Sequence, residues 1–244
     1  MTDAPAWQPP AGIAPRGTLL VLPGRGEHPL VYERFGRRLA QDGYVVHALG
    51  TTPGDAVEDV RQAASRAAGP QPAVPVVLVG NDTGALQALH AAAPPAGGLT
   101  VHGVVLAGAA PVNGPGITGT EDDWEAELDA RTACPTHRAR LSGDADFVRG
   151  RLAGPVPEHL LTDPRPGVPA LVLHGEDDSV TPVKEARERA ALLPGTTLGV
   201  VRDGVHDVLN DASHRTAAAA LVLWLEGLRA QPDTARPLLT LTEA

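Results

Sequence analysis

One short stretch limits the folds open to this chain more than any other. Val76 to Val79 is an apolar run, Gly80 follows it, and Gly84 opens a stretch of helical composition. This pattern is typical of a buried strand, a tight turn and a helix. Glycines are expected here because a Cβ atom would collide with the neighbouring strand or helix. The apex of the turn is Asp82, which places a carboxylate at the end of a strand.

The rest of the chain repeats the alternation of strands and helices. Continuous apolar runs rich in β-branched residues favour buried parallel strands, and apolar residues three or four positions apart favour helices. We predict strands over 18–22, 44–49, 75–79, 101–106, 170–174 and 196–201, and helices over 30–41, 55–68, 83–93, 121–141, 182–193 and 207–228. Residues 1–16 are interpreted as an arm, or at most a weak edge strand near Gly12 and Ile13, and a helix cap is expected near Asp55. The fold class is therefore α/β, with a mostly parallel central sheet flanked by helices.

The alternation stops between residues 111 and 167. This segment has no strand-like run, and it is too long for an ordinary loop. We interpret it as a small helical cap inserted into one core domain made of residues 1–110 and 168–230, with 231–244 as a C-terminal tail. The acidic cluster 121–123 is interpreted as a helix N-terminus, where acidic residues complement the dipole, rather than as a metal site.

The charge balance restricts the partners. The chain carries 20 Lys and Arg against 29 Asp and Glu, a formal charge of −9. This argues against nucleic acid or an anionic membrane as the main partner. No signal peptide or membrane-inserting run is visible. A single cysteine, Cys134, fits a reducing compartment and a packed or surface thiol. We expect a cytoplasmic protein that acts on a small molecule, and homo-oligomerisation is left open. The amino-acid bias fits a high-GC bacterial genome.

Three residues that follow the predicted strands 75–79, 170–174 and 196–201 carry the candidate chemistry. They are Asp82, Asp178 and His206. The order nucleophile, acid, histidine is that of the α/β-hydrolase triad. Ligands of open α/β sheets bind at the carboxyl edge of the strands, where these side chains are expected. Asp178 is preferred over Asp177 as the acid.

Several motifs show that the chain resembles the α/β-hydrolase superfamily over nearly its whole length, and its flanks are most similar to the monoglyceride lipase and lysophospholipase branch. The matching stretches are 24–28 (Gly-Arg-Gly-Glu-His), 32–46, 174–182 (His-Gly-Glu-Asp-Asp followed by Pro182) and 204–210. Two departures stand out: Pro23 replaces the usual histidine, and Asp82 replaces the serine nucleophile. The lipase activity of that branch is therefore not carried over.

With an aspartate at its apex, this turn resembles that of the haloalkane dehalogenases, haloacetate dehalogenases and epoxide hydrolases. That resemblance implies that Asp82 attacks a saturated carbon and that His206, held by Asp178, activates water to hydrolyse the ester. The backbone N–H groups of Arg25 and Thr83 would form the oxyanion hole. No cofactor or metal is expected. The cap tyrosines of the epoxide hydrolases and the tryptophan that follows the dehalogenase nucleophile have no counterpart here.

Two other readings stay open from the sequence. Asp82 serves as a general base in a lyase or isomerase, or it disables hydrolysis and leaves a ligand-binding scaffold. The Arg25 side chain either attracts a substrate carboxylate or points to solvent. Trp124 either donates its N–H to a leaving group or packs inside the cap.

Overall fold

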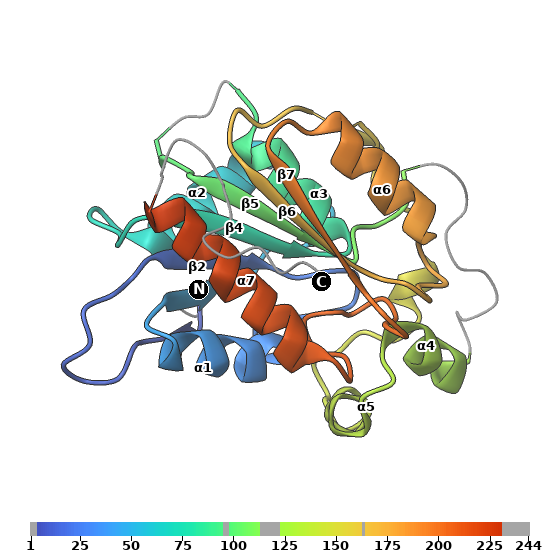
Figure 1. The fold of residues 1–244 in the computed structure, drawn as a ribbon. Helices are drawn as coiled ribbons and strands as arrows, with labels where there is room; N and C mark the ends of the chain where they lie inside the picture. Colours follow the sequence, from blue (N-terminus) through green and yellow to red (C-terminus); the bar gives the residue numbers. More distant parts are fainter. Residues whose placement is uncertain (1–3, 95–97, 113–122, 163, 231–244) are drawn as a thin grey trace, which may run out of the picture.

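The computed structural model describes residues 4–94, 98–112, 123–162 and 164–230 and shows a seven-stranded sheet between two layers of helices (Figure 1). The strand order is β1-β3-β2-β4-β5-β6-β7. β1 pairs antiparallel with β3, and every other neighbouring pair is parallel. The strands are β1 (Ala6–Trp7), β2 (Thr18–Leu22), β3 (Val45–Ala48), β4 (Val76–Asn81), β5 (Gly103–Ala107), β6 (Ala170–Gly175) and β7 (Thr196–Val201). The predicted fold class is confirmed.

Helices cover both faces of the sheet. On one face lie α1 (Glu33–Gln41) and α7 (His214–Ala230), which pack side chains such as Phe35 and Leu225 into the core. On the other face lie α2 (Val57–Ala68), α3 (Thr83–Ala92) and α6 (Val183–Leu192). The central strands β2, β4 and β5 are buried along their whole length, which explains their uninterrupted apolar sequences.

The described part of the segment between β5 and β6 contains two α-helices and two short 3₁₀ helices. They are α4 (Trp124–Arg131), α5 (Pro135–Ser142), η2 (Arg151–Ala153) and η3 (Glu158–Leu160). The His206 N–H donates to the Ala130 carbonyl at 3.3 Å, and the Asp207 N–H donates to the Arg131 carbonyl at 2.8 Å. α4 therefore rests on the loop after β7, beyond the carboxyl ends of the strands. Its status as a separate cap stays a prediction.

The single helix predicted over 121–141 is wrong. α4 ends at Arg131, Thr132 is extended (φ −159°, ψ 137°), and α5 starts at Pro135. A proline favours the first helical position and disfavours a helical residue before it, which explains the break. Asp123 caps α4 by accepting from the Ala126 N–H at 3.1 Å. The other two acidic residues of the cluster, 121 and 122, lie outside the described residues.

Two smaller expectations also need correction. The edge strand is Ala6–Trp7 rather than a stretch near Gly12. Asp55 does not cap α2, because its carboxylate accepts from the N–H and hydroxyl of Thr52, and Ala56 occupies the cap position.

The last helix starts at residue 214 rather than 207. The carboxylate of Asp211 accepts from the Thr132 hydroxyl and the Val205 N–H, which ties the preceding turns to neighbouring loops. The predicted tail, 231–244, lies outside the described residues.

Candidate active site

The turn at Asp82 has the tight geometry that its sequence predicts. β4 ends at Asn81, α3 begins at Thr83, and Asp82 between them has φ 51° and ψ −121°. A Cβ on Gly80 would lie 2.1 Å from the Gly84 carbonyl oxygen, and a Cβ on Gly84 would lie 2.2 Å from the Leu22 oxygen. Both glycines are required because backbone atoms of β2 and α3 occupy that space. A positive φ at a non-glycine residue is a strained conformation that recurs at functional sites.

His206 is positioned by the loop after β7. This loop passes so close to β5 that a Cβ on Gly108, which has φ +44°, would lie 2.1 Å from the His206 carbonyl oxygen. The absence of a side chain at Gly108 therefore lets the histidine loop approach the sheet edge. There the imidazole is fully buried.

A continuous hydrogen-bonded chain joins the three predicted residues. His206 Nδ1 lies 2.8 Å from Asp178 Oδ2, and His206 Nε2 lies 3.2 Å from Asp82 Oδ1. Asp178 Oδ1 accepts from the N–H groups of Val180 and Thr181, at 2.8 and 3.0 Å, which fixes the carboxylate. The structure thus brings Asp82, Asp178 and His206 together, with Asp178 rather than Asp177 on the histidine.

The Arg25 side chain binds the Asp82 carboxylate, contrary to both expectations for it. Nε donates to Asp82 Oδ2 at 2.8 Å and Nη2 donates to Oδ1 at 2.7 Å, while Nη1 donates to the Gly154 carbonyl at 2.6 Å. The Arg25 backbone N–H donates to the same Oδ2 at 2.8 Å. This N–H therefore lies where an oxyanion-hole donor is expected, and Thr83 adds a hydroxyl contact at 3.4 Å. Arg25 is 4% exposed and Asp82 has no exposed surface.

These contacts fix the charge states of the site. Burial opposes ionisation of Asp82, but the charge and hydrogen bonds of Arg25, together with His206, outweigh it and hold the Asp82 pKa well below its ordinary value. Burial also opposes the imidazolium of His206, yet Asp178 and then Asp82 raise its pKa to about 10. His206⁺ in turn lowers the pKa of Asp178 against the effect of burial. At neutral pH His206 is therefore a cation that lies between two carboxylates, Asp178 and Asp82.

A second buried polar network lies behind the turn and was not anticipated. Arg131 has no exposed surface and donates to Glu127 Oε1 at 2.9 Å and to the Arg25 carbonyl at 2.7 Å. Its Nη1 lies 3.8 Å from Asp207 and 4.0 Å from Glu27. The i,i+4 spacing of Glu127 and Arg131 was visible in the sequence, but such a pair normally lies on a helix surface. Here the pair is buried, and the Arg131 guanidinium holds the backbone of Arg25 through its carbonyl oxygen.

Two further side chains can be placed. Trp124 donates its Nε1–H to the Ser142 hydroxyl at 3.1 Å, and its ring packs on Phe147, so the packing role fits better than a leaving-group contact. Cys134 is a buried free thiol.

Within the described ranges, no group of three or more His, Cys, Asp or Glu side chains is arranged to hold a metal ion, and no helix is both long and apolar enough to cross a membrane.

Comparisons with known proteins agree with this architecture. A family model described as serine aminopeptidase, S33, matches residues 13–121. No curated protein sequence matches the chain. Among solved structures, a monoacylglycerol lipase of Paleococcus ferrophilus is similar with 19% identity and a TM-score of 0.66, covering 91% of this chain and 96% of that one.

Two more structures give the same picture. A soluble variant of the monoglyceride lipase from Saccharomyces cerevisiae shares 16% identity with a TM-score of 0.66, covering 91% of this chain and 90% of that chain. An esterase from a Rhodococcus species shares 19% with a TM-score of 0.65, covering 91% and 94%. At these identities the likeness establishes the fold. It confirms the predicted α/β-hydrolase fold.

Proposed function

We propose that this chain, which has the fold of the α/β-hydrolases, hydrolyses a small organic substrate through an Asp82 nucleophile assisted by His206 and Asp178. The observation that carries this proposal is the unbroken chain of hydrogen bonds from Asp178 through His206 to Asp82 at the strained turn. In this proposal the backbone N–H groups of Arg25 and Thr83 supply the oxyanion donors. The lipase and esterase activities belong to the similar structures and, at 16–19% identity, do not decide the chemistry of an aspartate at this turn.

The two oxygens of Asp82 have different environments, which assigns them different tasks. Oδ2 accepts from the Arg25 N–H and from Nε, so it occupies the oxyanion position. Oδ1 faces His206 and is the attacking oxygen. In the first step, Oδ1 forms a bond to a carbon that carries a leaving group, and that group departs with its bonding electrons. Arg25 Nη2 must first release Oδ1, since it donates to it at 2.7 Å.

The second step needs a neutral imidazole. Ester formation removes the charge of Asp82, one of the two carboxylates that hold the His206 proton, so the histidine pKa falls and the proton is lost to solvent. Neutral His206 then takes a proton from water, and the hydroxide attacks the Asp82 carboxyl carbon. The oxyanion forms on Oδ2, the ester bond breaks, and the product alcohol leaves with the old Oδ1 and the proton from His206.

Trapping of the ester tests this proposal. His206→Gln keeps a hydrogen-bonding side chain but removes the base, so the alkyl ester on Asp82 accumulates. We propose to incubate this variant with bromoacetate, bromoethane and styrene oxide as probes of three leaving-group types, and to measure intact mass and then map the peptide that contains residue 82. An adduct on Asp82 is expected with at least one probe.

The matched control is His206→Gln combined with Asp82→Asn. Bromoacetate also alkylates exposed nucleophiles, so only an adduct that disappears in the double variant counts. If no probe gives such an adduct, the nucleophile is not Asp82. The Arg25 clamp on both carboxylate oxygens would then favour a ligand-binding scaffold in which this ion pair is structural.

A further inference from the structure

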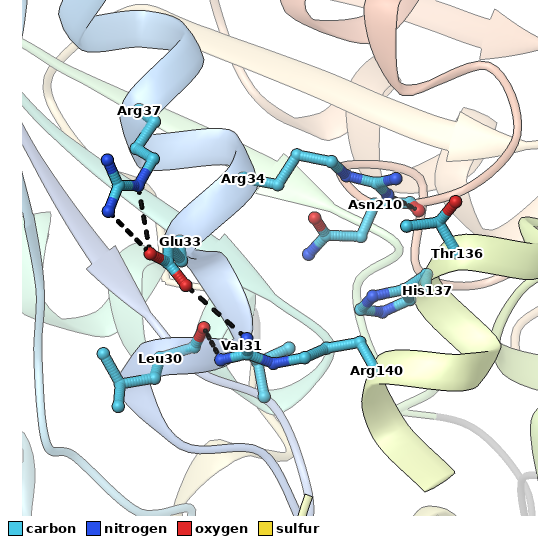
Figure 2. A pocket seen from close by; sticks show the side chains of 9 residues that line it. All are labelled: Leu30, Val31, Glu33, Arg34, Arg37, Thr136, His137, Arg140 and Asn210. Carbon is cyan, nitrogen blue, oxygen red and sulfur yellow. Dashed lines mark hydrogen bonds and ion pairs between the residues drawn. The ribbon is translucent and has the colours of Figure 1, made fainter. Parts of the chain in front are cut away.

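A cavity of about 390 Å³ lies between α1 and α5, away from the proposed catalytic residues (Figure 2). Four elements contribute to it: η1 (Pro29–Tyr32), α1, α5 and the turn before α7. It is lined by Leu30, Val31, Glu33, Arg34, Arg37, Thr136, His137, Arg140 and Asn210. Asp82, Asp178, His206 and Arg25 do not line it, so it is a separate site.

The lining has an excess of positive charge. Three arginines face one carboxylate, Glu33, which pairs with Arg37 at 2.8 Å and more loosely with Arg140 at 3.5 Å. Arg140 also lies 3.5 Å from Asp144. Two cations therefore share the Glu33 carboxylate: Arg37 donates twice to Oε1, at 3.0 and 2.8 Å, and Arg140 lies 3.5 Å from Oε2.

Arg34 stands apart from these pairs. Its guanidinium donates to two uncharged groups, the Asn210 carbonyl and, at 3.3 Å, the Cys134 sulfur. Among the described residues, no carboxylate forms an ion pair with Arg34. A cation that lines a cavity without a counter-ion favours an anionic occupant, since charge-assisted hydrogen bonds are stronger than neutral ones.

Asn210 adds a buried amide oxygen that has no hydrogen-bond partner among the described residues. The residue is 2% exposed, and no donor in the described ranges reaches its Oδ1. Figure 2 shows this amide extending from its loop toward α1, into the space beside Arg34. Leaving a buried amide unpaired costs about 1–3 kcal/mol. Because the amide oxygen and nitrogen can exchange places, the group can present N–H donors to an anion.

Leu30 and Val31 supply the apolar part of the lining. Val31 is buried, while Leu30 is about half exposed at the mouth of the cavity. A bare ion would leave this surface in water, whereas an anion with a short hydrocarbon body would cover it.

We propose that this cavity is a binding site for a small organic anion, with a carboxylate or phosphate head on Arg34, Arg140 and the Asn210 amide and a short apolar body against Leu30 and Val31. The full chain would be titrated calorimetrically with hexanoate, hexanol and inorganic phosphate. Hexanoate is expected to bind in the millimolar range or tighter. Hexanol has the same chain without the charge and is expected to give no measurable heat.

Arginine variants locate the binding. Arg34→Gln is expected to raise the hexanoate Kd at least about tenfold, since it removes a charge-assisted donor. Arg34 also donates to the Asn210 carbonyl, so its loss could disturb the fold as well as the site. Arg140→Gln, at an exposed position, is a second variant that keeps the fold, and it is also expected to raise the hexanoate Kd. Arg66→Gln, on α2 at the opposite face of the sheet, changes the net charge equally and is expected to leave the Kd unchanged.

Each result decides the proposal. Binding of hexanoate or of phosphate that depends on Arg34 or Arg140 supports it, and the arm that binds identifies the head group. Absence of binding by both anions overturns it. Equal binding of hexanoate and hexanol, or equal weakening by Arg66→Gln, also overturns it, because the heat would then arise from general hydrophobic or charge effects.

Discussion

Arg25 and Asp82 form a bidentate ion pair that is almost completely shielded from water, with guanidinium-to-carboxylate distances of 2.8 and 2.7 Å. The pair closes the site around the proposed nucleophile. It also neutralises a charge that would otherwise be buried next to a second carboxylate, Asp178.

Loss of Arg25 should therefore destabilise the fold. Removing one partner of a buried pair costs about 3–5 kcal/mol, because the other charge is left uncompensated. His206⁺ still faces Asp82, so we expect Arg25→Gln to lie at the lower end of this range. Urea denaturation measures the change in free energy of unfolding.

A double-mutant cycle isolates the pair itself. In the Asp82→Asn background no carboxylate needs compensation, so Arg25→Gln should cost less than in the parent protein, with a coupling of about 0.5–3 kcal/mol. Strictly additive costs would show that Arg25 stabilises the fold through its Gly154 contact instead. Arg66→Gln, an exposed change of equal charge, should stay within about 0.5 kcal/mol.

The His206 proton predicts how stability depends on pH. The histidine pKa rises from 6.5 to about 10 on folding, so its contribution is fully present below pH 6.5 and is lost as the pH rises through about 10. The free energy of unfolding should fall over this window by up to about 1.4 kcal/mol per pH unit from this group alone. Urea denaturation between neutral and alkaline pH measures it.

His206→Gln is the comparison that isolates this effect. The variant has no proton to lose at this position, so its stability should change less over the same window. Cys134, whose thiol pKa is lowered by Arg34 and backbone N–H groups against burial, contributes with the opposite sign, but it is present in both proteins and cancels in the difference. Identical pH profiles for the two proteins would mean that His206 is neutral in the folded state.

The turn glycines predict a steric effect. Gly84→Ala would place a Cβ 2.2 Å from the Leu22 oxygen and 2.6 Å from the Pro23 oxygen, and both are backbone atoms that cannot move without shifting β2. We expect a loss of at least about 3 kcal/mol, the upper range for overpacked cores, in urea denaturation.

Gly54→Ala is the matched control. Its Cβ would meet no atom of the described residues within 4 Å, so stability should change by less than about 0.5 kcal/mol. Equal effects of the two substitutions would indicate that the turn is looser than the structure shows.

The sheet and the three site residues follow from local sequence signals. Apolar runs such as Thr18–Leu22 are uninterrupted because the strands are buried on both faces. Such strands can be predicted from the sequence without tertiary information. Asp82, Asp178 and His206 each follow such a strand, so the shared edge of a parallel sheet brings them together.

Side-chain direction did not follow from the sequence. Arg25 lies between two glycines, and its guanidinium could have turned to solvent or to a ligand. Its course to Asp82 depends on the Gly154 carbonyl, which is 129 residues away in the chain. The break between α4 and α5 was readable from Pro135, whereas the burial of Arg131 depends on the packing of α4 over the sheet edge.

The most direct test of the central claim is where the oxygen of water goes during one turnover. The substrate is whichever of the three probes the parent protein turns over. The protein, in excess over this substrate, would react in ¹⁸O-water. Mass spectrometry would then measure the label in the product alcohol and in the peptide that contains residue 82. If Asp82 is the nucleophile, the label enters the Asp82 carboxylate and the product carries the unlabelled oxygen of the protein. Label in the product with none in Asp82 would contradict the account, because water would then have attacked the substrate directly.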